Sequence, residues 1–363
     1  MLFYFAIFFI LFIFSLCEIY GLRQTENKFF FSFLCFFLFI LSFIRWKTGT
    51  DWETYNVFFD ASIDWNIESE FEWGFARINE VVKILFDNYT VLLFILAIIL
   101  FFFQSTALLK FSPYPVTSLL FLWSISFANI FFVRQSIATA ILFFSIKYIR
   151  ERKLFNFLLC LFVAMLFHRT SLIFLLAWWI YPLKIRPIIM MIGIGFSLIL
   201  TVFLSELMLS LGSVFGGMAQ SKIQFYIENG EDAFGVEIPM AQIIFKGFIN
   251  KIFIFILSLY FLIVIEKREI EFRGYLNLYW VGILIYFSTI SISVALVRLS
   301  FAYDMCSVVM VPIILKNIQR KDLRFAMFLI FIIYFLMRLY VTINGVSFDS
   351  YVPFKTIITE IVN

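Results

Sequence analysis

The chain has 363 residues, of which 63% are hydrophobic and 14% are charged. A soluble globular protein is about half apolar, so this composition excludes an ordinary soluble fold and predicts an integral membrane protein. The net charge of +4 is small, and the absence of a long basic block argues against nucleic acid as a partner.

Apolar runs between charged residues predict about twelve membrane-spanning helices, because a spanning helix needs ~20 apolar residues. No Lys or Arg precedes the first run and no small-residue cleavage site follows it, so we expect a retained helix and not a signal peptide. The four runs between 117 and 182 are short, and some are candidates for tilted or re-entrant segments. The predicted spans are 2–20, 29–44, 91–109, 117–133, 136–149, 154–167, 170–182, 187–205, 242–265, 275–297, 299–315 and 324–343.

The distribution of basic residues predicts the topology, because cytoplasmic loops carry an excess of Lys and Arg. With both termini outside, 16 of the 28 basic residues fall in six short inside loops. Two acid-rich loops are then external: 45–90 has nine acids and four bases, and 205–241 has five acids and one base. The alternation holds through all twelve spans. We therefore predict a multi-pass membrane protein with both termini and both acid-rich loops outside.

The sequence predicts one all-α transmembrane domain over 1–363, because no repeat or linker divides it. All four Cys residues lie in apolar stretches, so no disulfide and no thiol chemistry is expected. His168 is the single histidine, and no Cys/His cluster is present. We therefore expect no metal site and no cofactor.

Polar residues that interrupt apolar runs identify candidate sites, because an Arg near the bilayer centre costs ~2.5–3.5 kcal/mol. The first is segment 45–55, which packs two bases, two acids and two Trp residues around a Gly turn. It is either an interfacial anchor or the wall of a polar pocket whose aromatic side chains stack on sugars. The second is Arg134-Gln135, where a simple turn would more often use Gly, Asn or Pro. A helix cap is the alternative interpretation.

The third candidate site is His168-Arg169, which is followed by two hydroxyl residues. A lone His is more often structural than catalytic, but histidine is the side chain that changes charge near neutral pH. The fourth site is Arg298, followed by Tyr303 and Asp304. Asp304 would lie further inside the membrane and needs a partner, and an ion pair is one structural explanation.

The predicted topology gathers Arg residues at the outer face. Several guanidinium groups in one membrane pocket would repel each other unless an anion lay between them, and Arg grips phosphate in a fork. We therefore expect a lipid-linked diphosphate, with Arg charges neutralising the leaving group in place of a metal ion. The Arg residues concerned are Arg45, Arg134, Arg169 and Arg298.

These segments resemble the EpsG-type family of Wzy polysaccharide polymerases, in order and spacing along most of the chain. The most specific part is the stretch RQSIA at 134–138, followed about thirty residues later by Phe167-His168. The resemblance implies a helix bundle like that of GT-C membrane glycosyltransferases. It also implies a glycosyltransferase that polymerises undecaprenyl-diphosphate-linked repeat units at the outer face, with an inverting or a retaining outcome. A flippase and a chain-length regulator are the implied partners.

The resemblance also assigns roles to residues. Arg134, Arg169 and Arg298 are candidates for diphosphate contact, with Arg45 as a weaker one, and Asp51 and His168 compete as the base that activates the acceptor hydroxyl. The loop 205–241 is the natural place for acceptor specificity. The candidates for orienting or stacking on sugar and phosphate are Gln135, Tyr303, Trp52, Trp65 and Trp73.

Three other functions fit the same features. A transporter or flippase of lipid-linked units would also have about twelve helices, but transporters usually show two related halves and a site near mid-membrane. A glycan ligase would need the same Arg chemistry, so the sequence separates it poorly from a polymerase. A non-catalytic envelope scaffold would not explain the cost of several Arg residues in apolar runs.

Overall fold

The computed structural model describes the chain except for residues 22, 64–70, 132, 216–244, 246, 291–293, 346–347 and 363. All regular elements in these described residues are helices, which confirms the predicted all-α class. Most of the predicted external loop 205–241 lies outside the described residues, and so does Trp65.

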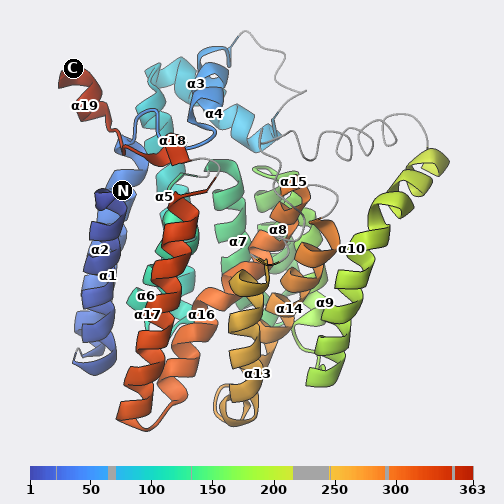
Figure 1. Cartoon of the computed structure of the whole chain (residues 1–363). Helices are drawn as coiled ribbons and strands as arrows, with labels where there is room; N and C mark the ends of the chain where they lie inside the picture. The colour runs from blue at the N-terminus through green and yellow to red at the C-terminus, as the bar shows by residue number, and fades with distance from the viewer. Residues whose placement is uncertain are drawn as a thin grey trace. The chain divides into compact units, whose positions relative to one another are not determined.

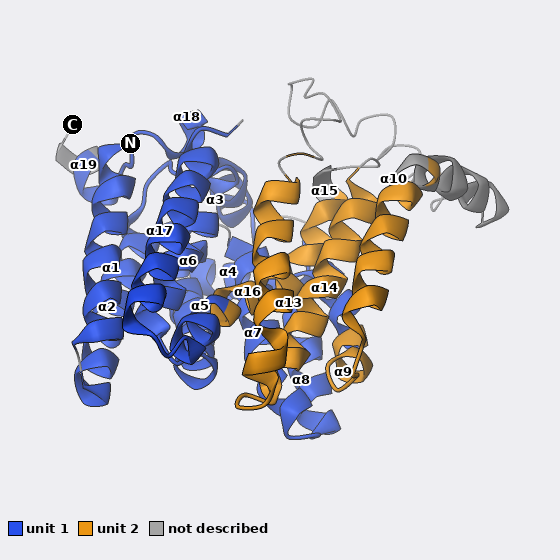
Figure 2. Cartoon of the chain, turned by 60° about the horizontal axis from the view of Figure 1, so that its bottom comes forward, with its two compact units in different colours: residues 1–175, 311–363 blue, residues 176–310 orange. Residues whose placement is uncertain are grey.

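The described residues form two compact units, which Figure 2 shows in different colours. Unit 1 comprises Met1–Leu175 and Val311–Asn363, and unit 2 comprises Leu176–Met310. The boundaries fall within two elements, η2 (Arg169–Leu176) and α16 (Phe301–Asn317). The other helices of unit 1 are α1 (Leu2–Tyr20), α2 (Gln24–Ile44), α3 (Trp52–Asp60), α4 (Trp73–Phe86), α5 (Tyr89–Phe111), α6 (Pro115–Ser126), η1 (Phe127–Asn129), α7 (Val133–Arg150), α8 (Leu154–Met165), α17 (Lys321–Ile343), α18 (Phe348–Tyr351) and α19 (Ile357–Val362). The other helices of unit 2 are α9 (Ala177–Ile180), α10 (Pro187–Phe215), η4 (Phe248–Ile252), α13 (Phe253–Glu266), α14 (Glu271–Thr289), α15 (Val294–Val297) and η5 (Arg298–Ser300).

Six helical segments of the described chain are long and apolar enough to cross a membrane. Shorter apolar helices of 10–17 residues include those between 115 and 180, which is the region where the sequence already predicts short or re-entrant segments. The chain is therefore a helical membrane protein, while the number of twelve spans stays a prediction. The six segments are Leu2–Tyr20, Gln24–Ile44, Tyr89–Phe111, Phe248–Glu266, Arg298–Asn317 and Lys321–Ile343.

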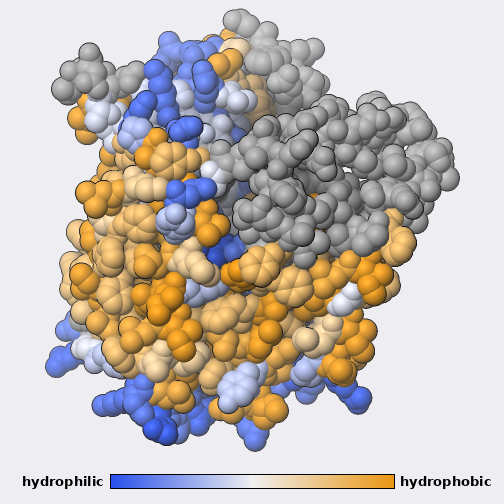
Figure 3. All heavy atoms as spheres, viewed as in Figure 1, coloured by the Kyte–Doolittle hydropathy of each residue, from blue (hydrophilic) through white to orange (hydrophobic). Residues whose placement is uncertain are grey.

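The surface of unit 1 has the distribution of side chains that a bilayer requires. On the face shown in Figure 3, apolar side chains cover its middle, and hydrophilic side chains gather at its two ends. Phe side chains such as Phe29, Phe33 and Phe36 of α2 are more than half exposed, as lipid-facing positions would be.

Both termini lie at one end of unit 1, together with α3 and α4 (Figure 1). Tyr4 at the start of α1 donates its hydroxyl to the carbonyl of Tyr351. The amide of Gly49 donates to the carbonyl of Ser350 at 2.7 Å, so the segment after α2 also joins the C-terminal segment. This end of unit 1 is the one that the sequence predicts to be external.

A sharp break between α6 and α7 positions the start of α7. Phe127, Ala128 and Asn129 all have left-handed backbone conformations, with φ of 51°, 51° and 66°. Such conformations cost roughly 1–3 kcal/mol each for residues other than Gly. Gln104 of α5 stabilises the break with its side-chain amide. It donates to the backbone carbonyl of Ala128 at 3.2 Å and accepts from the side-chain amide of Asn129 at 2.8 Å. The chain therefore enters α7 in a direction that tertiary contacts impose.

Close packing fixes the first turn of α4 against the end of α8. A Cβ atom at Gly74 would lie 2.6 Å from Cβ of Leu166 and 2.9 Å from its carbonyl oxygen. The amide of Phe75 donates to that same carbonyl at 3.2 Å. Only a residue without a side chain allows this approach of the two backbones.

We expect Gly74→Ala to destabilise the protein by about 1–3 kcal/mol, because the added methyl group must displace α4 from α8. The thermal unfolding midpoint of the purified protein in detergent measures the effect. Gly195→Ala in α10 is the matched control, since its added Cβ would meet nothing within 4 Å. That substitution should be neutral or slightly stabilising. Equal midpoints for the two variants would show that this contact does not constrain α4.

Candidate active site

A single carboxylate joins three residues that the sequence predicts as site residues. Glu72 immediately precedes α4, and its Oε2 accepts from Nη1 of Arg134, in the first turn of α7, at 2.6 Å. Its Oε1 accepts from the backbone N–H of Arg169 at 3.2 Å and lies 3.4 Å from Nδ1 of His168. Three parts of the chain, around Glu72, Arg134 and His168, therefore meet at this carboxylate.

The environment of Glu72 keeps its carboxylate ionised. Burial raises its pKa, but the adjacent His168 imidazole, followed by the Arg134 guanidinium and the Arg169 backbone N–H, lowers the pKa to about 2. Among the described contacts, Arg169 bonds to Glu72 through its backbone N–H, and the residue is exposed. Its guanidinium adds a positive charge next to Glu72 in the chain fold, which favours binding of an anion.

Arg134 is held in place and still keeps donors for a ligand. Its Nε donates to the hydroxyl of Tyr55 at 3.0 Å, and its guanidinium carbon lies 4.4 Å from the ring centroid of Phe71. An arginine has five N–H donors, and the bonds to Tyr55 and Glu72 use two of them. The remaining three suit a phosphate group, and the side chain is 20% exposed.

His168 is the least satisfied polar side chain of this cluster. Both ring nitrogens are buried, and neither has a hydrogen-bond partner among the described residues. Nδ1 is the nitrogen that faces Glu72, which leaves Nε2 buried and without a described partner. A buried nitrogen without a partner costs free energy, and a ligand hydroxyl at Nε2 would recover it.

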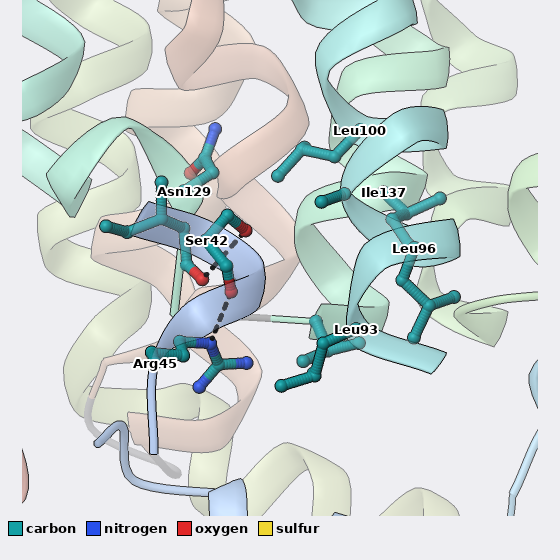
Figure 4. Close-up of a pocket in the computed structure, with 10 residues that line it drawn as sticks. Ser42, Arg45, Leu93, Leu96, Leu100, Asn129 and Ile137 are labelled. Atoms are coloured by element: carbon teal, nitrogen blue, oxygen red, sulfur yellow. Dashed lines mark hydrogen bonds between the residues drawn. The ribbon is translucent and has the colours of Figure 1, made fainter. Parts of the chain in front are cut away.

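Arg45 lies at the same end of unit 1 but has a different environment. It is 2% exposed, and its guanidinium donates to the carbonyls of Ser42 at 3.1 Å and Thr48 at 2.7 Å. The cavity beside it is about 10 Å³, which is enough for one water molecule at most (Figure 4). A diphosphate does not fit in this cavity, and the Arg45 guanidinium instead joins the last turn of α2 to the turn that follows it.

The other predicted site residues of unit 1 also differ in whether a ligand can reach them. Trp52 is 4% exposed and packs edge-on against Trp46 and Tyr89, so its ring is not open to a sugar in this structure. Trp73, next to Glu72, is 61% exposed and can stack on a ligand. Gln135 follows Arg134 in α7 and is half-buried. Asp51 is the N-cap residue of α3, and its carboxylate interacts electrostatically with Arg45.

Three predicted residues belong to unit 2. Arg298 begins η5 and is exposed, whereas Tyr303 is fully buried against Gly282. Asp304 has the ion-pair partner that the sequence argument requires, because Lys251 donates to both of its carboxylate oxygens, at 2.6 and 2.5 Å. The plain ion-pair explanation of Asp304 is thus confirmed.

Glu72 and Tyr55 are the site residues that sequence reasoning missed. Glu72 is one of nine acids in segment 45–90, and nothing in its immediate neighbourhood distinguishes it except its place directly before an apolar helix. Tyr55 ends the first candidate segment but carries no signal of its own. The charge of Arg134 predicts that one of these acids pairs with it, but the sequence does not show which acid.

Comparison with known protein families finds a match over most of this chain. The family model described as EpsG family matches residues 28–356. The matched region includes Glu72, Arg134, His168, Arg169 and Arg298. No curated protein and no solved structure matches the chain.

Proposed function

Because the chain belongs to the EpsG family, we propose that it is a membrane glycosyltransferase that polymerises lipid-linked oligosaccharide units. The substrates would be undecaprenyl-diphosphate-linked repeat units at the outer face of the bacterial cytoplasmic membrane. One observation carries this proposal: Glu72 gathers two guanidinium-bearing residues and the single histidine at one end of unit 1. An anion-binding group beside an acid–base group is what transfer from a diphosphate requires.

The proposed reaction moves the growing glycan from its lipid diphosphate to a hydroxyl of an incoming unit. The bond between the anomeric carbon and the diphosphate oxygen breaks, and its electron pair stays on the diphosphate. The bond between the anomeric carbon and the acceptor oxygen forms, and the hydroxyl proton passes to Nε2 of His168. Arg134 and Arg169 stabilise the charge that grows on the diphosphate.

Glu72 supports both halves of this reaction. Its charge holds Nδ1 of His168 as the donor nitrogen and stabilises the imidazolium that forms, as a carboxylate does beside a catalytic histidine. Its other oxygen fixes the Arg134 guanidinium. Arg298 is a third candidate for diphosphate contact because of its charge and exposure, and Asp51 is the alternative base.

Reconstitution tests this function. The full chain in proteoliposomes, supplied with lipid-linked repeat units, is expected to yield a ladder of glycans on gel electrophoresis or mass spectrometry. The ladder should also form in the presence of EDTA, because the proposal uses Arg in place of a metal ion. Movement of units across the bilayer without lengthening would indicate a flippase instead. A single transfer to another acceptor would indicate a ligase.

A further inference from the structure

An apolar cavity of about 470 Å³ adjoins the candidate active site within unit 1. It lies between α4, the C-terminal end of α8 and the first turns of α5, and its lining atoms are almost all apolar. Trp73 and Gly74 line it from α4, and Leu166 and Phe167 line it from the α8 end. We call it the α4–α8 cavity.

The α4–α8 cavity begins where the polar cluster ends. Trp73 directly follows Glu72 in the chain, and Phe167 directly precedes His168. Both segments that form the polar cluster therefore also contribute residues to the cavity lining. The hydrogen bond from the Phe75 amide to the Leu166 carbonyl joins the two walls. A ligand with a charged head at Arg134 could therefore extend an apolar tail into this space.

The exposed side of α4 gives lipid access to the same cavity. Val81, Ile84, Leu85 and Phe86 are 51–66% exposed, although the helix also carries Arg77, Glu80 and Lys83. Exposed apolar side chains beside charged ones suit the membrane interface, where the apolar side chains reach the lipid chains and the charged ones reach water. Val81 is one of these exposed residues, and it lines the cavity together with Arg77. The chain of a membrane lipid can thus enter without crossing water.

We propose that the α4–α8 cavity binds the isoprenoid chain of a polyprenyl diphosphate, the lipid part of the substrate. This inference rests on the proposed function, because that function supplies the diphosphate head at Arg134 and Arg169. The volume of the cavity is within the 300–1,000 Å³ typical of ligand pockets. An ordinary phospholipid chain would fill the same space, but its single phosphate would make less use of two guanidinium groups.

Photo-crosslinking without turnover tests the proposal. The full chain in phosphatidylglycerol nanodiscs is exposed to a sugar-free polyprenyl diphosphate that carries a diazirine in its isoprenoid chain. Mass spectrometry should find the label on residues that line the cavity, such as Ile78 and Phe167. Unlabelled polyprenyl diphosphate should displace the probe. Displacement by excess phosphatidylglycerol to the same degree, or labelling elsewhere, would overturn the proposal.

A matched pair of variants on α4 makes the test specific. Val81→Trp fills the cavity at a half-exposed position, and probe affinity should fall about tenfold, since each buried methylene contributes ~0.8 kcal/mol. Ile84→Trp adds the same side chain on the same helix at a position that does not line the cavity, and it should bind as the natural protein does. Equal labelling of both variants would contradict the assignment.

The outcome is separable from that of the proposed function. If the natural protein makes no polymer but labels in the cavity, the polymerase activity fails and the lipid site stands. If it makes polymer but does not label in the cavity, the lipid site alone fails. Among active proteins, Val81→Trp should raise the KM for a long-chain donor and leave kcat unchanged, whereas a donor with a two-isoprene chain should show no difference.

Discussion

Arg134→Lys is expected to lower the rate of polymerisation by about 10²–10³-fold, the loss that follows removal of a group that stabilises a developing anion. The lysine can keep the ion pair with Glu72. It has a single ammonium group, however, and cannot also donate to the Tyr55 hydroxyl and grip a phosphate in a fork. Cells with this variant should display single repeat units in place of long glycan, and the purified variant should yield no ladder.

The control for this variant is Arg320→Lys. Arg320, the residue just before α17, pairs with Asp322 in the first turn of that helix. Both side chains are mostly exposed, so the substitution should change neither the rate nor the glycan length. Membrane insertion of the two variants is compared by the amount of protein in washed membranes. Normal glycan length from Arg134→Lys would remove the diphosphate role from this residue.

Glu72→Gln is expected to slow polymerisation by about 10²-fold, the lower end of what a positioned acid–base pair contributes. The amide keeps the shape of the side chain but loses the charge that faces Nδ1 of His168 and Nη1 of Arg134. Glu151→Gln, in a surface pair with Lys153, is the control and should leave the rate unchanged. Full activity of Glu72→Gln would remove the positioning role from this carboxylate.

The pH dependence of stability provides an independent readout for Glu72. The pKa of this carboxyl is lowered from 4.5 to about 2 by folding, so its stabilising effect is fully present above about pH 4.5. That effect is lost as the pH falls toward 2, when the carboxyl becomes protonated. The difference in unfolding midpoint between the natural protein and Glu72→Gln should therefore be constant above pH 5 and should shrink below it. A difference that persists unchanged at low pH would contradict the ionised pair.

A double-substitution cycle decides whether Glu72 acts through His168. If it does, Glu72→Gln added to His168→Gln should cost little more than His168→Gln alone, because the two residues act as a unit. Asp51→Asn tests the competing base in the same assay. Loss of activity in Asp51→Asn together with full activity in His168→Gln would transfer the role of base to Asp51.

The sequence by itself determined that this protein is surrounded by lipid and that its secondary structure is helical. Long apolar runs such as 2–20 and 91–109 can satisfy their backbone hydrogen bonds in lipid only as helices, so run length predicts these elements almost to their ends. The order and spacing of four polar segments, at 45–55, 134–138, 167–172 and 298–303, also predicted the family that the family model confirms. Each of these features depends on residue types and their order along the chain, so the sequence alone reveals it.

Only the tertiary structure decided which polar residues act together. Arg45 and Arg134 look alike in the sequence, yet backbone carbonyls surround one and a carboxylate and aromatic rings surround the other. Glu72 is one acid among nine until α4, α7 and α8 bring its partners from 62 to 97 residues away. The left-handed turn at 127–129 likewise depends on Gln104. Such pairings depend on distances between segments remote in the chain, and no local pattern encodes them.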